Sequence, residues 1–187
     1  MVNNPKEQLS LEELYQVAIE YSEKGVYEKA AKIYEKVARS RKPGASSNVQ
    51  KVPHCKAAYA LGRLYEDGLL LNASMEKAVE WYTRSAKLGE ANAHLKLSRL
   101  YLLGNGVGQS YEEAYFYLIE AFFAADAAGG TCLDVAQILP ICEGLLGNTE
   151  EHEKDVLRLL GDCYRLGWGC APSESQVEEY YARSKNL

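Results

Sequence analysis

Apolar residues recur through most of this chain at three- and four-residue intervals, the period of a helix with one buried face. Ala57, Leu61 and Tyr65 are spaced by four, so they share one face of a predicted helix. Gly68 is placed to end that helix, because glycine accepts the left-handed backbone conformation of a helix cap. A second run at the same intervals consists of Met75, Ala78, Trp81, Tyr82, Ser85 and Ala86. Antiparallel helices interlock when small residues meet large ones, so we predict a helical hairpin.

The first helix of this hairpin carries a phrase that occurs three times, with a leucine, a small residue, a tyrosine and a glycine at fixed offsets. The copies are Leu61-Gly62-x-x-Tyr65-x-x-Gly68, Leu97-Ser98-x-x-Tyr101-x-x-Gly104 and Leu160-Gly161-x-x-Tyr164-x-x-Gly167. A second anchor follows each tyrosine after 13 residues, at Ala78, Ala114 and Val177. Self-similarity at this period is typical of a solenoid, whose repeats bury their apolar faces by stacking on neighbours.

Residues 9–40 form a fourth predicted hairpin in a different register. Tyr21 is followed by its small anchor, Ala30, after nine residues, so the turn between the two helices is four residues shorter than in the other copies.

The last two copies of the repeat are separated by an insertion. Tyr101 and Tyr164 are 63 residues apart, and the intervening sequence predicts one extra helix over about 131–147. Thr131 can cap this helix, and Pro140 should kink it or restart it. One added helix makes the alternation of first and second helices uneven. The final pair must therefore re-register, or the extra helix must pack across the stack.

On these motifs the chain resembles a Sel-1-like repeat protein, and the hairpin at 9–40 is closer to a tetratricopeptide repeat. The resemblance implies an all-α fold, an α-α superhelix built from helical hairpins, with about nine helices in this chain. It also implies one domain over residues 1–187, with repeat units at about 9–40, 54–89, 91–127 and 153–187 and the inserted helix at about 131–147.

Composition and charge narrow the class of partner. The net charge is −5, with 21 Lys and Arg against 26 Asp and Glu and no basic stripe, which disfavours nucleic acid. The most apolar stretch, Ala114 to Ala125, contains Glu120 and is too short for a membrane span, so we expect no membrane insertion. The first residues lack the apolar region of a signal peptide. We therefore expect a cytoplasmic protein, with secretion by a route that needs no signal peptide as the alternative.

The motifs that would indicate catalysis are missing from the sequence. It contains no G-x-x-x-x-G-K, no G-x-S-x-G and no H-E-x-x-H, so we expect no enzymatic activity and no cofactor. The five cysteines form no C-x-x-C and do not recur at matching repeat positions, which favours buried free thiols. His152, Cys163 and Cys170 could approach one another as zinc ligands, but no fourth ligand is evident and we expect no metal site.

The resemblance implies that the first helices of the hairpins line the concave side of the stack. Tyrosine and arginine are favoured at binding hot spots because they combine contact area with hydrogen bonding. A groove with tyrosines and arginines suits an extended segment that carries some acidic groups. The alternative is an ordinary solvated helix face. The candidate partner-binding residues are Tyr15, Tyr59, Arg63, Glu66, Arg99, Leu102, Arg158 and Arg165.

The expected function is therefore a non-catalytic protein–protein interaction module or adaptor that binds a partner peptide or protein on its concave surface. One alternative is a dedicated inhibitor or chaperone of a single effector or toxin, and another is a hydrolase on a Sel-1-like scaffold. The inserted helix at about 131–147 is the alternative binding surface. The sequence leaves the identity of the partner and the oligomeric state open.

Overall fold

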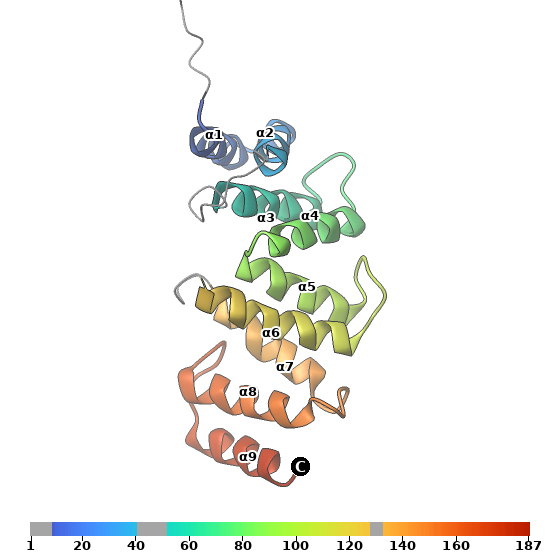
Figure 1. Cartoon of the computed structure of the whole chain (residues 1–187), viewed down its shortest axis with the longest axis vertical. Helices are drawn as coiled ribbons and strands as arrows, with labels where there is room; N and C mark the ends of the chain where they lie inside the picture. Colours follow the sequence, from blue (N-terminus) through green and yellow to red (C-terminus); the bar gives the residue numbers. More distant parts are fainter. Residues whose placement is uncertain (1–8, 41–51, 128–132) are drawn as a thin grey trace, which may run out of the picture. The chain divides into compact units, whose positions relative to one another are not determined.

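The computed structural model describes residues 9–40, 52–127 and 133–187, and within these residues it is helical with no strand (Figure 1). The described helices are α1 (Leu11–Glu23), α2 (Tyr27–Arg39), α3 (Val52–Glu66), α4 (Met75–Lys87), α5 (Ala91–Leu103), α6 (Tyr111–Ala127), η2 (a 3₁₀ turn, Val135–Gln137), α7 (Ile138–Leu145), α8 (Glu153–Leu166) and α9 (Glu174–Lys185). This confirms the predicted fold class, an all-α helical-hairpin solenoid. None of the described helices combines the length and hydrophobicity that a bilayer span requires.

The chain divides into two compact units, residues 1–88 (unit 1) and 89–187 (unit 2). In unit 1, α1 pairs with α2 and α3 pairs with α4, while α2 packs on α3. The core of this unit contains Ala18, Tyr34, Val37, Leu61 and Trp81. The two hairpins that the apolar spacing predicts in this part of the chain are therefore present.

Serine caps begin the second helices of three hairpins, where local sequence decides the boundary. The hydroxyl oxygens of Ser74, Ser110 and Ser173 accept hydrogen bonds from backbone N–H groups three residues later, at 3.2, 3.2 and 3.5 Å. Such caps satisfy N–H groups that the first helical turn leaves without a partner. The predicted glycine caps are also observed, since Gly104 and Gly167 end α5 and α8 with φ of 68° and 72°.

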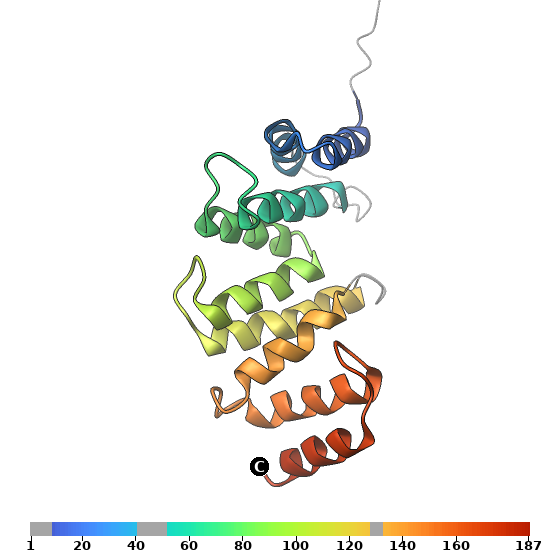
Figure 2. The same cartoon turned by 180° about the vertical axis from the view of Figure 1, so that it is seen from behind.

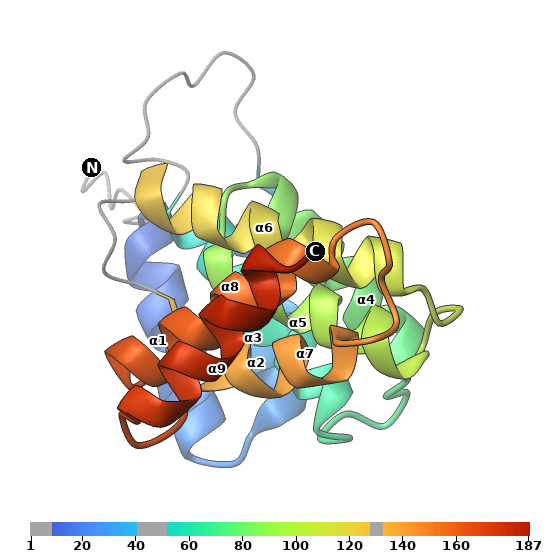
Figure 3. The same ribbon diagram turned by 90° about the horizontal axis from the view of Figure 1, so that it is seen from below.

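In unit 2, α5 pairs with α6 and α8 pairs with α9, and the inserted helix α7 packs against α5, α6 and α8. Figure 2 shows α7 (orange) running obliquely between the two hairpins, and Figure 3 shows α8 beside α9. The core of this unit contains Leu118, Ile138, Ile141, Leu145 and Leu160. The extra helix is thus a layer of the stack.

The insertion differs from its predicted extent. The extra helix spans Ile138–Leu145 instead of about 131–147, and it follows the 3₁₀ turn η2. Pro140 lies in the first turn of α7, where its missing N–H breaks no intrahelical hydrogen bond. Thr131, the predicted cap, lies outside the described residues.

The small residue of the repeated phrase marks the closest approach within each hairpin. A Cβ atom built on Gly62 would lie 2.8 Å from two ring carbons of Tyr82, and one on Gly161 would lie 2.5 Å from Tyr181. In the middle copy the hydroxyl of Ser98 donates to the carbonyl of Ala114 at 2.6 Å. The predicted register of the repeat is therefore correct.

Candidate partner-binding surface

Two equivalent tyrosine pairs lie at the junction of first and second helices in unit 1. The ring of Tyr15 on α1 lies 5.8 Å from that of Tyr34 on α2, with an interplanar angle of 52°. One repeat later, the ring of Tyr59 on α3 lies 5.5 Å from that of Tyr82 on α4, at 49°. The fold therefore places the two predicted tyrosines, both half-buried, against buried tyrosines of the second helices.

Tyr34 links the candidate residues of α1 and α3. Burial raises its pKa to about 12, and the neighbouring Tyr15 acts in the same direction. A hydrogen bond from Ser22 and the positive charge of Arg63 oppose this rise in the pKa. Tyr15 and Arg63, from different helices, are thus both within electrostatic reach of one buried phenol. Arg63 itself is exposed.

Tyr82 anchors the remaining candidate of unit 1. Its hydroxyl donates a short hydrogen bond to the carboxylate of Glu66 on α3. Burial is the main reason that the pKa of Tyr82 is raised, and the carboxylate of Glu66 adds to it, since a donated proton is held more firmly. The half-buried Glu66 therefore holds the hydroxyl of Tyr82 in place.

Sequence reasoning missed the part that Tyr34 and Tyr82 play beneath the candidate residues. The signal was available, because each lies four residues after its small anchor, Ala30 or Ala78, and so shares a helix face with it. Tyr181 stands at the same position of the last hairpin, four residues after Val177.

In the first hairpin of unit 2, leucines stand where unit 1 has two tyrosines and a glutamate. Leu95, Leu102 and Leu118 occupy the repeat positions that Tyr59, Glu66 and Tyr82 hold in unit 1. All three leucines are buried in the core cluster that includes α7. A Cβ atom on Gly144 of α7 would lie 2.7 Å from Leu102. The expectation that Leu102 faces a partner is therefore wrong, because α7 covers this side chain.

The other candidates of unit 2 are exposed arginines. Arg99 lies on α5, at the repeat position of Arg63. Arg158 lies 3.6 Å from the carboxylate of Asp155 in an exposed ion pair. Arg165 donates to Asp162 at 2.6 Å, and this contact is the main reason that its pKa is raised. Arg158 and Arg165 thus already have acidic neighbours on α8.

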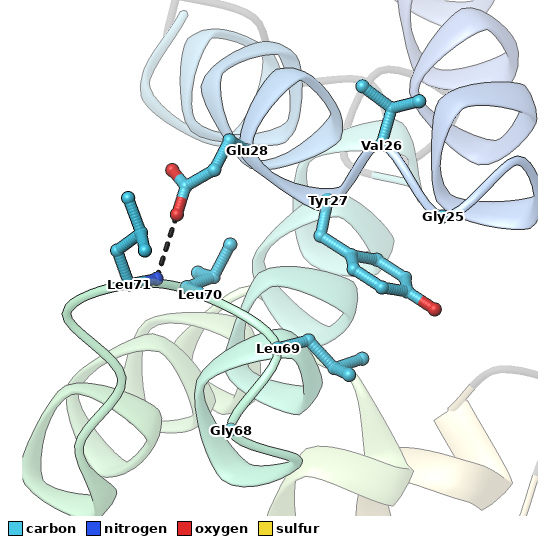
Figure 4. Close-up of a pocket in the computed structure, with 8 residues that line it drawn as sticks. All are labelled: Gly25, Val26, Tyr27, Glu28, Gly68, Leu69, Leu70 and Leu71. Atoms are coloured by element: carbon cyan, nitrogen blue, oxygen red, sulfur yellow. Dashed lines mark hydrogen bonds between the residues drawn. The ribbon is translucent and has the colours of Figure 1, made fainter.

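An open cleft of about 470 Å³ lies between the two interhelix turns of unit 1 and was not predicted from the sequence (Figure 4). Glu28 crosses between the turns, since its carboxylate accepts a hydrogen bond from the backbone N–H of Leu71 at 2.8 Å. The lining residues are Gly25, Val26, Tyr27, Glu28, Gly68, Leu69, Leu70 and Leu71. With a single carboxylate that is already engaged by the backbone, the cleft offers no acid–base pair for catalysis.

The described cysteines are free thiols, of which Cys55, Cys142 and Cys163 are buried and Cys170 is half-buried. Contact with Cys163, followed by burial, raises the pKa of the Cys142 thiol. Cys132 lies outside the described residues. Within the described part of the chain, no three His, Cys, Asp or Glu side chains gather closely enough to hold a metal ion.

Comparison with known proteins agrees with the repeat and the fold. The family described as Sel1 repeat matches residues 55–90 and 91–122. The structure is similar to that of a Sel1 repeat protein from Oxalobacter formigenes, with a TM-score of 0.52, 22% sequence identity, and coverage of 98% of this chain and 74% of that one. At this identity the similarity shows the fold.

A second solved structure is c5321, a protective antigen present in uropathogenic Escherichia coli strains displaying an SLR fold. It shares 19% identity with a TM-score of 0.39 over 95% of this chain, which spans 46% of that protein. No curated protein has a matching sequence. The chain therefore contains two adjacent Sel1 repeats, at residues 55–90 and 91–122, and its helical-hairpin architecture is similar to that of a solved Sel1 repeat protein.

Proposed function

We propose that the chain is a non-catalytic adaptor that binds a partner peptide or protein along the exposed side of its first helices. Sel1 repeat proteins generally act as protein-interaction modules, which supports this class of function. The observation that carries the proposal is the setting of Arg63. Its guanidinium is exposed on α3, and its charge lowers the pKa of the buried Tyr34 on α2, whose ring packs against Tyr15 of α1. Residues of three helices are thus within electrostatic reach of one another.

The chemistry of this surface favours a segment that carries acidic groups. Lys56 and Arg63 are exposed on α3 and lie seven residues apart, which is two helical turns, so they share one face. Half-buried Tyr59 lies between them along the helix. Arginine and tyrosine at such a site supply hydrogen bonds and contact area to a peptide carboxylate and its neighbours. Arg99 presents the same group at the equivalent position in unit 2.

The test uses a partner captured from native lysate and identified by mass spectrometry. We expect Arg63→Ala to weaken binding of that partner by about tenfold or more, and Arg63→Ala with Arg99→Ala to abolish it, because truncating an interface arginine costs about 2 kcal/mol or more. Lys32→Ala, which removes an exposed cation of α2, is the matched control and should bind normally. Melting temperatures should stay close to that of the wild type, since exposed substitutions cost within about 0.5 kcal/mol.

Normal binding by the double variant would rule out the first-helix surface. One stoichiometric partner in the capture would favour a dedicated inhibitor or chaperone over an adaptor, and several partners would favour the adaptor.

A further inference from the structure

Helix α6 is apolar on two faces. Its inner face is buried in unit 2 through Ala114, Leu118, Ala121 and Ala125. On the opposite face, Phe116 and Phe123 are 53% and 65% exposed. They lie seven residues apart, which is two helical turns, so they form one stripe with half-buried Ile119 between them. In Figure 3, α6 (yellow) runs along the edge of unit 2.

The repeat itself does not require phenylalanine at these positions. Counted from the small anchor of each second helix, the positions of Phe116 and Phe123 are exposed in all four hairpins. The other three hairpins carry Lys32 and Arg39, Glu80 and Lys87, and Glu179 and Asn186 there. Exposed apolar groups at sites that the fold leaves polar elsewhere indicate an interaction surface.

The surroundings of this stripe are acidic. Glu112 lies one turn before Phe116 and Glu120 one turn after it, so both carboxylates flank the same face. Residues 100–153 contain nine Asp and Glu and no Lys or Arg. Unit 2 as a whole has 7 basic and 15 acidic residues, a net charge of −8, whereas unit 1 has 14 basic and 11 acidic residues.

We propose that this exposed face of α6 binds a cationic amphipathic helix of a partner protein. A helix with apolar residues two turns apart matches the spacing of Phe116 and Phe123, which is about 10 Å along the axis. Lysines or arginines beside that apolar stripe would meet Glu112 and Glu120, which favours such a segment by charge complementarity.

Two other occupants fit the charge less well. In a second copy of this chain, the same face would bring carboxylates against carboxylates, since residues 100–153 hold no Lys or Arg. Helices that lie on anionic membranes carry Lys and Arg on their polar face, and α6 carries neither. This surface is separate from the proposed first-helix surface, because it lies on a second helix and selects the opposite charge.

The probe for the test is a fluorescent leucine–lysine peptide of about five helical turns, with leucines at helical spacing. Binding is measured by fluorescence anisotropy in about 0.15 M NaCl, where weak long-range attraction is screened. A peptide of the same composition in scrambled order and a leucine–glutamate peptide are the controls.

We expect saturable binding of the leucine–lysine peptide by the wild-type chain and weaker binding of both control peptides. Phe116→Ser with Phe123→Ser should reduce the affinity at least about tenfold, because it removes the apolar stripe. Glu112→Gln with Glu120→Gln should reduce both the affinity and its dependence on salt. Glu80→Gln with Lys87→Gln on α4 is the matched control, since these residues hold the repeat positions of Phe116 and Phe123, and it should bind like the wild type.

If circular dichroism shows that the Phe116→Ser, Phe123→Ser variant has lost helicity, its weaker binding could reflect unfolding. The Glu112→Gln, Glu120→Gln variant then decides the test. Absent binding, equal binding of the scrambled peptide, or unchanged affinity in both α6 variants would overturn the proposal. Self-association that the serine variant abolishes would assign the face to a second copy, and binding to phosphatidylcholine vesicles that it abolishes would assign it to a membrane; either result overturns the proposal. Arg63→Ala with Arg99→Ala should leave peptide binding unchanged. A negative result for the proposed first-helix surface can therefore be told apart from a negative result for the α6 surface.

Discussion

At the scale of single residues, Gly62 shows how the repeated phrase acts. A side chain at this position would overlap the ring of Tyr82, which is fully buried and cannot move aside into solvent. The close approach of α3 and α4 depends on the missing Cβ, and the short hydrogen bond from Tyr82 to Glu66 depends on that approach.

Gly62→Leu should therefore destabilise the protein by about 1–3 kcal/mol or more, because overpacking forces buried side chains and backbone to shift. Gly108→Leu is the matched control, since a Cβ there would meet no atom within 4 Å. Urea unfolding of both variants measures the difference. Equal stability of the Gly62 variant and the wild type would show that the repeat register is wrong.

The buried phenol of Tyr34 makes stability depend on pH in the alkaline range. Burial raises its pKa from 10.0 to about 12, so the folded state keeps a proton that the unfolded chain releases from about pH 10 upward. The stabilisation is fully present below pH 10 and is lost as the pH rises through about 12. Burial raises the pKa of Tyr82 in the same direction.

Tyr34→Phe removes this titration, so its urea midpoint should fall less than that of the wild type between about pH 9 and pH 11. The comparison uses the slope with pH, because the substitution also removes the hydrogen bond with Ser22 at every pH. A variant that loses stability as steeply as the wild type would show that Tyr34 is not the responsible group.

At the scale of elements, the inserted helix α7 accounts for the apolar, buried residues that unit 2 carries where unit 1 has polar ones. Ile138, Ile141 and Leu145 are buried in the same core cluster as Leu95 and Leu102, which stand where unit 1 has a tyrosine and a glutamate. The leucines and α7 depend on each other. Without α7 the leucines would be exposed to water at a cost in free energy, and without the leucines α7 would have no apolar surface to pack on.

Ile141→Ala should cost about 2–5 kcal/mol, because it leaves a cavity in the core shared by α7 and its neighbours. Glu143→Ala, on the exposed side of the same helix, should change stability by no more than about 0.5 kcal/mol. Thermal unfolding of the two variants separates these outcomes. If both behave like the wild type, α7 is only loosely attached.

At the scale of the whole molecule, the two units have separate hydrophobic cores. The cluster of unit 1 contains residues from Ala18 to Trp81, and that of unit 2 contains residues from Leu95 to Cys163. A segment with its own core meets the main requirement for independent folding.

A fragment of residues 89–187 should therefore be helical and unfold cooperatively in urea. Circular dichroism measures both properties. The same fragment with Ile141→Ala is the control for loss of the core and should unfold at lower urea. A coil-like spectrum from the unmodified fragment would show that its stability comes from the rest of the chain.

The sequence by itself determined the hairpins, their register and most of their ends. Apolar periodicity and the serine and glycine caps depend on residues within a few positions of one another, and Gly62 recurs at a fixed offset in the repeat, so these features can be recognised without coordinates. Only the tertiary structure decided that α7 buries Leu102, that Tyr34 lies within reach of both Tyr15 and Arg63, and that α6 leaves Phe116 exposed. These outcomes depend on which distant segments pack together, and a single helix pattern specifies that a face is apolar but not what covers it.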